Sequence, residues 1–323
     1  MNILFDLFED LWYNLCNLRG GIIMNVITLS NRVFNNLEPL ALSKSVLHTE
    51  STMLKFNRHG KPNVIKKLYY NDGEIFANKL YTLEMLSTNK DKIPRSFLIP
   101  DSLISVSGVI RGFSCPFMDG INFEDFLNDN KVSTEEKIYF LKKVGEILNQ
   151  MKAIRNHSPL KDFFLCDLHS SNFIVNPYNK ELGVCDLDSM KIGGNKSSHS
   201  RYLSEFALLN KVDGKYKNNA YNKDIAFVTA DENSDLYCYM MMILSFLYGS
   251  SAVNLFDLSK FYDYLNYLEY IGVNKDLVHE FATLVSNKDN SNPSYLLESL
   301  NRQQVCRANY KVYEKVKNTF RTK

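Results

Sequence analysis

The spacing of apolar positions along the chain changes near residue 120. Between residues 41 and 118, short runs of Val, Ile, Leu, Tyr and Phe alternate with turns, which predicts strands. The runs STMLKF and NVIKKLYY flank the turn Arg-His-Gly-Lys-Pro and predict a hairpin. SLISVSGVIRGFSCPF predicts two more strands, and residues 74–88 have helical spacing through Ile75, Leu80 and Leu83.

From residue 121 onward the spacing is mainly helical. Ser133 and Glu136 have the spacing of a capping box, and apolar residues follow them at helical intervals. The run LYCYMMMILSFLYG (236–249) predicts a buried helix that ends at Gly249. This run is shorter than the ~20 residues that a membrane span needs, so we expect no transmembrane segment. The fold class is therefore α+β, with a small strand-rich part joined to a larger helical part near Cys115–Gly120.

Residues 1–20 repeat Leu and Phe at helical intervals and predict an additional N-terminal helix. Its polar face carries Asp6, Glu9 and Asp10, which favours docking on the protein's own body or on a partner over binding a membrane surface. The same acidic residues do not fit a secretory signal. We divide the chain into a helical extension (1–40), a strand-rich part (41–118) and a helical part (119–323).

Composition limits the function classes. The chain has 323 residues, a formal net charge of +2 and 45% hydrophobic residues, which is ordinary for a globular protein. This charge gives no indication of nucleic-acid binding. The six cysteines form no C-x-x-C pair or zinc-ligand pattern, so we expect free thiols and a cytoplasmic location.

Residues 163–190, FFLCDLHSSNFIVNPYNKELGVCDLDSM, gather acidic and amide side chains around a predicted hairpin. Phe173-Ile174-Val175 and Leu182-Gly183-Val184-Cys185 are its strands, and Asn-Pro-Tyr-Asn-Lys is its turn. The hairpin places Asp167, Asn172 and Asp186 at one end. Carboxylates beside apolar residues are costly unless a cation or a substrate proton uses them, so this end of the hairpin is a candidate active site.

Four elements in order now resemble the protein kinase-like superfamily. They are Lys66 in the strand NVIKKL, the connector CPFMDGINFEDFL, the loop D-L-H-S-S-N (167–172), and Asp186 in D-L-D. The resemblance implies a bilobal fold and a phosphoryl-transfer site that uses ATP and Mg²⁺. In it, Lys66 binds the ATP phosphates, Asn172 and Asp186 hold the metal, and Asp167 takes the acceptor proton.

The resemblance also implies further site residues. ENSDLYCYMMMILSFLYG (232–249) resembles the start of the family's central helix, where an aspartate, here Asp235, caps the catalytic-loop backbone. In the connector, backbone groups of Pro116 and Met118 would pair with adenine, and Cys115 would be the gatekeeper. The glycine-rich phosphate loop is absent, and HTESTMLKF (48–56) offers Ser51 and Thr52 in its place. Lys67, next to Lys66 in the strand, should point to the opposite face.

The glutamate that pairs with the strand lysine in this family is ambiguous in this sequence. Glu84 has a similar spacing from Lys66, and we expect it to be the partner. KLYTLEML instead aligns Lys79 with the glutamate position. At the loop, His169 replaces the lysine usual in protein kinases, which resembles aminoglycoside and choline phosphotransferases. His169 would contact the γ-phosphate or the acceptor, or form hydrogen bonds within the loop.

We therefore expect an ATP- and Mg²⁺-dependent kinase that phosphorylates a hydroxyl, with Ser or Thr of a protein as the acceptor. The long polar segment Lys191–Asn233, which resembles an activation and peptide-docking segment, favours the protein substrate. Two alternatives stay open. D-L-H-x-x-N and the pair Asp186 and Asp188 suggest a small-molecule phosphotransferase, and the missing glycine loop suggests a pseudokinase that acts as a binding module.

Overall fold

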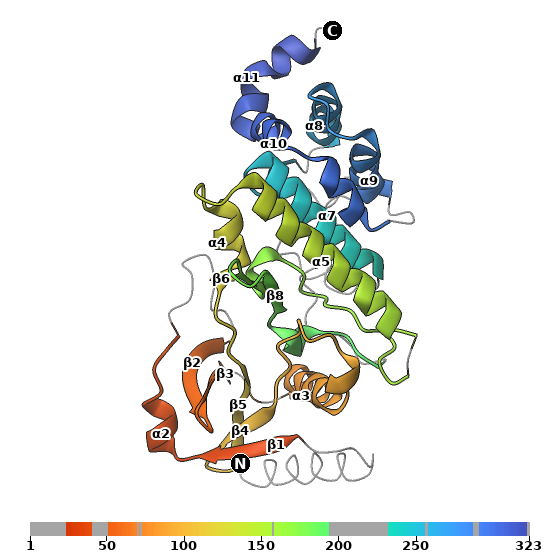
Figure 1. Ribbon diagram of the computed structural model, residues 1–323. Coiled ribbons are helices and arrows are strands. Elements are labelled where there is room, and N and C mark those ends of the chain that lie inside the picture. Colours follow the sequence, from red (N-terminus) through yellow and green to blue (C-terminus); the bar gives the residue numbers. More distant parts are fainter. Residues whose placement is uncertain are drawn as a thin grey trace.

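The computed structural model describes residues 24–40, 51–69, 71, 73–156, 158–193, 232–255, 258–286 and 291–321. The five-stranded sheet lies at one end of the molecule with α2 and α3 beside it, and the C-terminal helices lie at the other end (Figure 1). The strands are β1 (Asn25–Leu29), β2 (Ser51–Arg58), β3 (Lys61–Leu68), β4 (Ser102–Val106), β5 (Val109–Pro116), β6 (Ile121–Asn122), β7 (Phe173–Asn176) and β8 (Glu181–Val184). The helices are α2 (Asn31–Asn35), α3 (Gly73–Thr88), α4 (Phe123–Asn128), α5 (Thr134–Ile154), α7 (Glu232–Tyr248), α8 (Leu258–Tyr270), α9 (Lys275–Ser286), α10 (Arg302–Ala308) and α11 (Tyr310–Arg321).

A five-stranded sheet has the order β1-β4-β5-β3-β2. The predicted hairpins are confirmed as β2–β3 and β4–β5, both antiparallel. Every residue of β4 is buried, and β4 has a neighbouring strand on each side. One apolar cluster that includes Phe113 and a second that includes Phe34 pack on this sheet.

The predicted boundary at residue 40 does not hold. Asn25–Leu29 forms β1, which pairs in parallel with β4 and extends the five-stranded sheet. Residues 24–40 therefore belong to the strand-rich part of the chain. The segment Asn25–Leu29 is short, and only its pairing with the distant strand β4 distinguishes it from a loop. The helix predicted over residues 1–20 lies outside the described residues.

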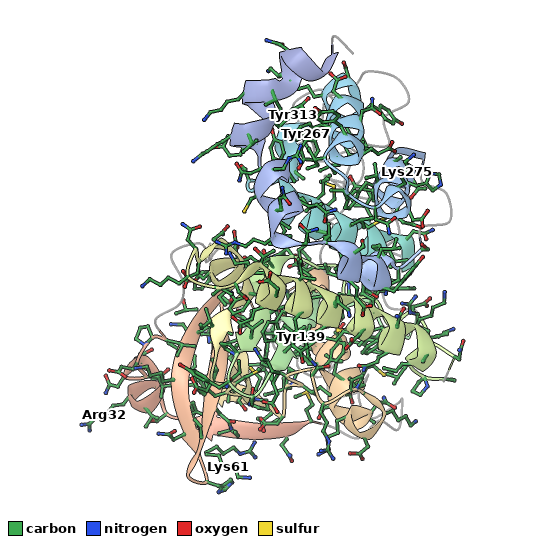
Figure 2. The ribbon with its side chains drawn as sticks, turned by 45° about the horizontal axis from the view of Figure 1, so that its top comes forward. Arg32, Lys61, Tyr139, Tyr267, Lys275 and Tyr313 are labelled. Atoms are coloured by element: carbon green, nitrogen blue, oxygen red, sulfur yellow. The ribbon has the colours of Figure 1, made fainter. Side chains whose placement is uncertain are left out.

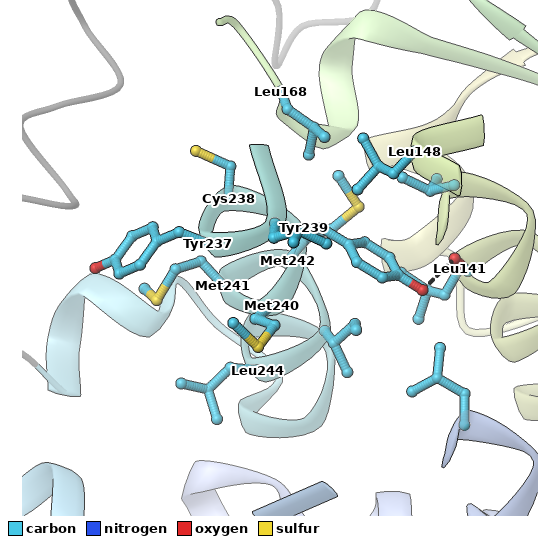
Figure 3. Close-up of a cluster of buried hydrophobic side chains, with 14 of the residues drawn as sticks. Leu141, Leu148, Leu168, Tyr237, Cys238, Tyr239, Met240, Met241, Met242 and Leu244 are labelled. Atoms are coloured by element: carbon cyan, nitrogen blue, oxygen red, sulfur yellow. Dashed lines mark hydrogen bonds between the residues drawn. The ribbon is translucent and has the colours of Figure 1, made fainter. Parts of the chain in front are cut away.

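The helical part is built around α5 and α7. Ser133 caps α5, and its hydroxyl accepts a hydrogen bond from Glu136 N at 3.1 Å, as the sequence predicts. α7 is buried nearly all round, so it forms the centre of the largest apolar cluster. The Tyr239 hydroxyl of α7 donates to the Leu141 carbonyl of α5 at 2.9 Å (Figure 3).

The C-terminal helices pack through tyrosines. The rings of Tyr267 (α8) and Tyr313 (α11) lie 5.1 Å apart, and Figure 2 shows both at the far end from Lys61, which is beside the β2–β3 turn. No helix among the described residues is both long and apolar enough to cross a bilayer. The molecule is a mixed α+β fold: a mixed sheet at one end, several helices at the other, and a three-stranded sheet, β6-β7-β8, beside α4.

Candidate active site

The hairpin β7–β8 brings the predicted polar residues to one end. Phe173 pairs with Val184, and Cys185 N donates to the Asn172 carbonyl at 2.9 Å. Asn172 and Asp186 therefore leave the hairpin side by side, as the sequence predicts. The hairpin is short, but both of its strands pack in the apolar core, which fixes its register.

The loop before this hairpin, residues 165–172, is held by α7. The carboxylate of Asp235 accepts hydrogen bonds from Leu165 N at 2.9 Å and Cys166 N at 3.1 Å. These are the contacts with the loop backbone that the sequence analysis expects of Asp235. Cys166 has φ 59°, a left-handed conformation that is costly for a residue with a β-carbon. The buried carboxylate of Asp235 stabilises the loop in this shape.

Asn172 and α4 hold the other end of the loop. The Asn172 side chain donates to the Asp167 carbonyl at 2.9 Å. Asn122 donates to the Ser171 carbonyl at 2.8 Å, and Glu124 accepts from the Ser171 hydroxyl. Sequence reasoning missed Asn122 and Glu124, because no motif marks them. The polar residues that start α4 were the available signal.

Asp167 and His169 lie together in the loop. His169 Nε2 is 3.2 Å from Asp167 Oδ1, and the Asp167 side chain is 15% exposed. Burial alone would lower the pKa of His169, but the hydrogen bond and charge of Asp167 outweigh it and raise that pKa above its ordinary value. The loop thus presents a carboxylate that is oriented by an imidazole and reaches solvent at its edge.

Lys66 reaches this site from β3. It lies 5% exposed, with its ammonium 5.8 Å from the centre of the Phe113 ring. Lys67 instead lies over Phe34, so the two lysines point to opposite faces of the sheet, as predicted. The Lys66 ammonium contacts the Asp186 carboxylate, 120 residues away in sequence, and lies 2.7 Å from Asp188 Oδ1.

A second lysine completes a cluster of four charges, of which Asp186 alone is partly exposed. Lys79, on α3, lies 2.6 Å from the other oxygen of Asp188, and both side chains are buried. The cluster consists of Lys66, Lys79, Asp186 and Asp188. Asp186 has φ 61°, which an aspartate tolerates better than most residues, and this turn lets both carboxylates meet Lys66.

The two aspartates of the cluster differ. Burial would raise the pKa of Asp188, but Lys66 and Lys79 outweigh it and hold that pKa well below its ordinary value. For Asp186 burial dominates and raises the pKa, although Lys66 opposes it. The Asp188 side chain is fully buried, whereas that of Asp186 is 32% exposed. Asp186 is the carboxylate that an incoming cation can reach.

The structure does not bring Glu84 to Lys66. Among the described residues, the ion pairs of Lys66 are with Asp186 and Asp188. Glu84 follows Lys79 by five positions (84 − 79), which turns it about 140° around the helix from Lys79. Burial raises the pKa of Glu84. Sequence spacing favoured Glu84, but helix rotation decides which side chain faces the site.

The predicted nucleotide-binding positions lie at the start of β2 and at the end of β5. Ser51 and Thr52 belong to strand β2 and not to a turn, and the Thr52 hydroxyl is 2.6 Å from that of Tyr69. Residues 48–50, which belong to the same predicted phosphate-loop segment (48–56), lie outside the described residues. Pro116 ends β5, and Met118 follows it and lies over Gly183. Burial raises the pKa of the Cys115 thiol to about 12, so it is neutral.

A cavity of about 490 Å³ adjoins the loop. α4, α7 and residues 168–171 supply most of its wall, and the residues that line it include Glu124, Leu127, His169, Met241, Met242 and Phe246. His169 therefore links this cavity to Asp167.

The donors at the hairpin end fit a hard divalent cation such as Mg²⁺. Asp186 offers a partly exposed carboxylate, and the Asn172 amide offers an oxygen while its nitrogen is bound to the Asp167 carbonyl. In the part of the chain that the structure describes, no group of three or more His, Cys, Asp or Glu forms a metal site. Two protein oxygens, from Asp186 and Asn172, suit an ion that takes waters and phosphate oxygens as its other ligands.

Searches with the sequence find no matching protein-family model and no matching curated protein.

Proposed function

We propose that this protein is a kinase-like phosphotransferase with a bilobal fold, which uses ATP and Mg²⁺ to phosphorylate a hydroxyl. The observation that carries the proposal is the contact between Lys66 and Asp186, at the hairpin end that also holds Asn172 and Asp167. These four residues are of the types that kinase-type phosphoryl transfer uses, and Lys66 comes from a distant part of the sequence. The acceptor we propose is Ser or Thr of a protein.

The proposed roles follow from charge and exposure. Lys66 supplies a buried positive charge for the α- and β-phosphates. Asp186 and Asn172 hold Mg²⁺, which neutralises the charge that develops on the phosphate oxygens. Asp167 orients the acceptor hydroxyl and takes its proton, and His169 fixes the direction of the Asp167 carboxylate. Backbone groups near Pro116 and Met118 receive the adenine.

The test is phosphoryl transfer from labelled ATP with Mg²⁺, with the protein alone and with generic protein acceptors. Wild type is compared with Asp167→Ala and Asp186→Ala, and with Asp276→Ala, which changes an exposed aspartate of α9 far from the site. We expect label on protein with wild type and Asp276→Ala, and a loss of at least about 100-fold with the other two. Equal, background-level transfer by all four would overturn the enzyme proposal and leave a binding module.

One observation favours a second candidate, a small-molecule phosphotransferase. The cavity of about 490 Å³ beside His169 lies in the size range of ligand sites. Its wall has one carboxylate, Glu124, and mixes apolar side chains such as Phe246 with hydroxyls such as that of Ser245, which suits a polar ligand with a cationic group. Turnover of aminoglycosides or choline, with none of protein, would select this candidate. The long polar segment 191–233 favours the protein acceptor, although residues 194–231 lie outside the described residues.

A further inference from the structure

The four-charge cluster contains two residues, Asp188 and Lys79, to which the proposed mechanism gives no role. Asp188 uses both of its carboxylate oxygens: Oδ1 lies 2.7 Å from Lys66 and Oδ2 lies 2.6 Å from Lys79. It is fully buried and belongs to the segment after β8, while Lys79 comes from α3 and Lys66 from β3. One carboxylate therefore ties together three elements.

We propose that Asp188 and Lys79 form a positioning pair for Lys66: Asp188 holds the Lys66 ammonium in place, and Lys79 holds Asp188. This inference rests on the proposed function, because positioning matters only if Lys66 contacts phosphate. It deepens that function by giving Lys66 a buried counter-ion that does not compete for the metal.

The geometry explains why a second carboxylate is needed. Asp186 also contacts Lys66, but Asp186 is the partly exposed carboxylate that would turn to Mg²⁺. Once it does so, Lys66 would lose one partner at the moment when it must stay fixed. Asp188 has no exposed surface, so it would keep its contact with Lys66 when Asp186 turns to the metal.

Lys79 is explained by the same charge balance. Two ammonium groups and two carboxylates neutralise one another within the cluster, which a buried group of charges requires. Without Lys79, Asp188 would have one cation fewer and more freedom to rotate. The hydroxyl of Thr82, one helical turn after Lys79, donates to the Met190 carbonyl at 3.2 Å. This hydrogen bond ties α3 to the same segment as Asp188.

The test uses the full chain and the variants Asp188→Asn, Lys79→Met and the double variant Asp188→Asn/Lys79→Met. Lys67→Met is the matched control, because Lys67 is the neighbouring strand lysine on the opposite face. Melting temperature is measured without nucleotide. The kcat and KM for ATP are then measured well below the lowest melting temperature, so that only folded protein contributes.

We expect Asp188→Asn to lower the melting temperature by roughly 10 °C, since it leaves two buried ammonium groups with one carboxylate. The double variant should melt higher than Asp188→Asn, because it removes the surplus charge. In the folded protein, kcat/KM should fall about 100-fold with Asp188→Asn and about tenfold with Lys79→Met, as misplacement of a catalytic group predicts. Lys67→Met should leave kcat and the KM for ATP within about twofold of the wild-type values.

The outcomes separate the two proposals. Turnover by wild type, with unchanged kcat and KM in folded Asp188→Asn and Lys79→Met, overturns the positioning role alone and makes the pair merely structural. Wild type that neither binds nor turns over ATP overturns the proposed function and this inference with it. A double variant that melts lower than Asp188→Asn overturns the charge-balance argument.

Discussion

Two segments flank the hairpin β7–β8, and they are held in different ways. The loop at residues 165–172 is held by hydrogen bonds between single polar groups and its backbone, above all from Asp235, Asn172 and Asn122. The segment at residues 186–190 is held by ion pairs with lysines from β3 and α3. The loop therefore depends on satisfied backbone groups, and the segment depends on charge balance.

The difference suits the chemistry we propose. A base such as Asp167 must keep one direction, and hydrogen bonds to the loop backbone fix the shape of the loop that carries it. The metal-holding segment must accept a divalent cation and phosphates, so its own charges must be balanced beforehand. Substitutions in the two segments should therefore differ in how much stability they cost. Four predictions test this, from the largest expected effect to the smallest.

The largest loss of stability should follow removal of Asp235, the residue of α7 that accepts two hydrogen bonds from the loop backbone. In Asp235→Ala, the N–H groups of Leu165 and Cys166 lose their acceptor in a buried place. At about 2 kcal/mol for each unsatisfied group, we expect a loss of about 4 kcal/mol in the free energy of unfolding. Urea unfolding measures it. Asp276→Ala, which also removes an aspartate from the first turn of a helix, should cost less than about 1 kcal/mol. Equal losses in the two variants would contradict this account of the loop.

The stability of the segment should depend on how deeply the removed charge is buried. Asp186 and Asp188 both contact Lys66, yet only Asp188 is fully buried between two lysines. We expect Asp188→Asn to cost about 3 kcal/mol of unfolding free energy and Asp186→Asn about 1 kcal/mol or less. Denaturant unfolding of both variants side by side gives the ranking. The reverse ranking would mean that the partly exposed Asp186 stabilises the fold more than the buried Asp188 does.

The strand that carries Lys66 should be sensitive to its neighbour in β5. A β-carbon at Gly112 would come 2.2 Å from the Lys66 carbonyl oxygen, which is backbone and cannot move aside. Gly112→Ala should therefore cost about 2 kcal/mol and shift Lys66 from its carboxylates. At Gly183 a β-carbon would meet the flexible end of Met118, so Gly183→Ala should cost less than about 1 kcal/mol. Thermal unfolding compares the pair, and similar melting temperatures would contradict the close packing of β3 on β5.

The smallest effect concerns the loop's own ion pair. Since Asp167 raises the pKa of His169 despite burial, the pair adds stability that is fully present below the unfolded pKa of histidine. That stability is lost as pH rises through the folded pKa. His169→Gln should thus cost less than about 1 kcal/mol at pH 5 and nothing at pH 9, because the imidazole is half exposed. NMR titration of the ring protons should give a midpoint above 6.5, the ordinary value for histidine. A midpoint below 6.5 would contradict the pairing.

Much of the fold follows from local patterns in the sequence. The hairpins, the cap at Ser133 and the apolar run of α7 each have a signal within a few residues. The polar end of β7–β8 was predictable for the same reason, because hairpin register fixes which residues meet. β1 was not predictable, because its partner β4 is far along the chain and the strand is short and half exposed.

The site residues that belong to a sequence motif were predictable. The residues that only balance the charge of other residues, Lys79 and Asp188, were not. Lys79 aligned with the position of a glutamate, and Asp188 was noticed only as part of D-x-D. Their ion pair spans 109 residues, and no local pattern links them. The choice of Glu84 rested on spacing along the chain, whereas the partner of Lys66 came from the segment after β8. A basic residue at an expected acidic position, together with an extra acidic residue elsewhere, is the signal for such a pair.

The most direct test of the proposed active site is a crystal structure with Mn²⁺ and a non-hydrolysable ATP analogue. We predict an anomalous-difference peak within bonding distance of a carboxylate oxygen of Asp186 and the amide oxygen of Asn172. The phosphates should lie against Lys66, and Asp188 should remain between Lys66 and Lys79. A structure with no metal at Asp186, or with the nucleotide bound elsewhere, would contradict the account.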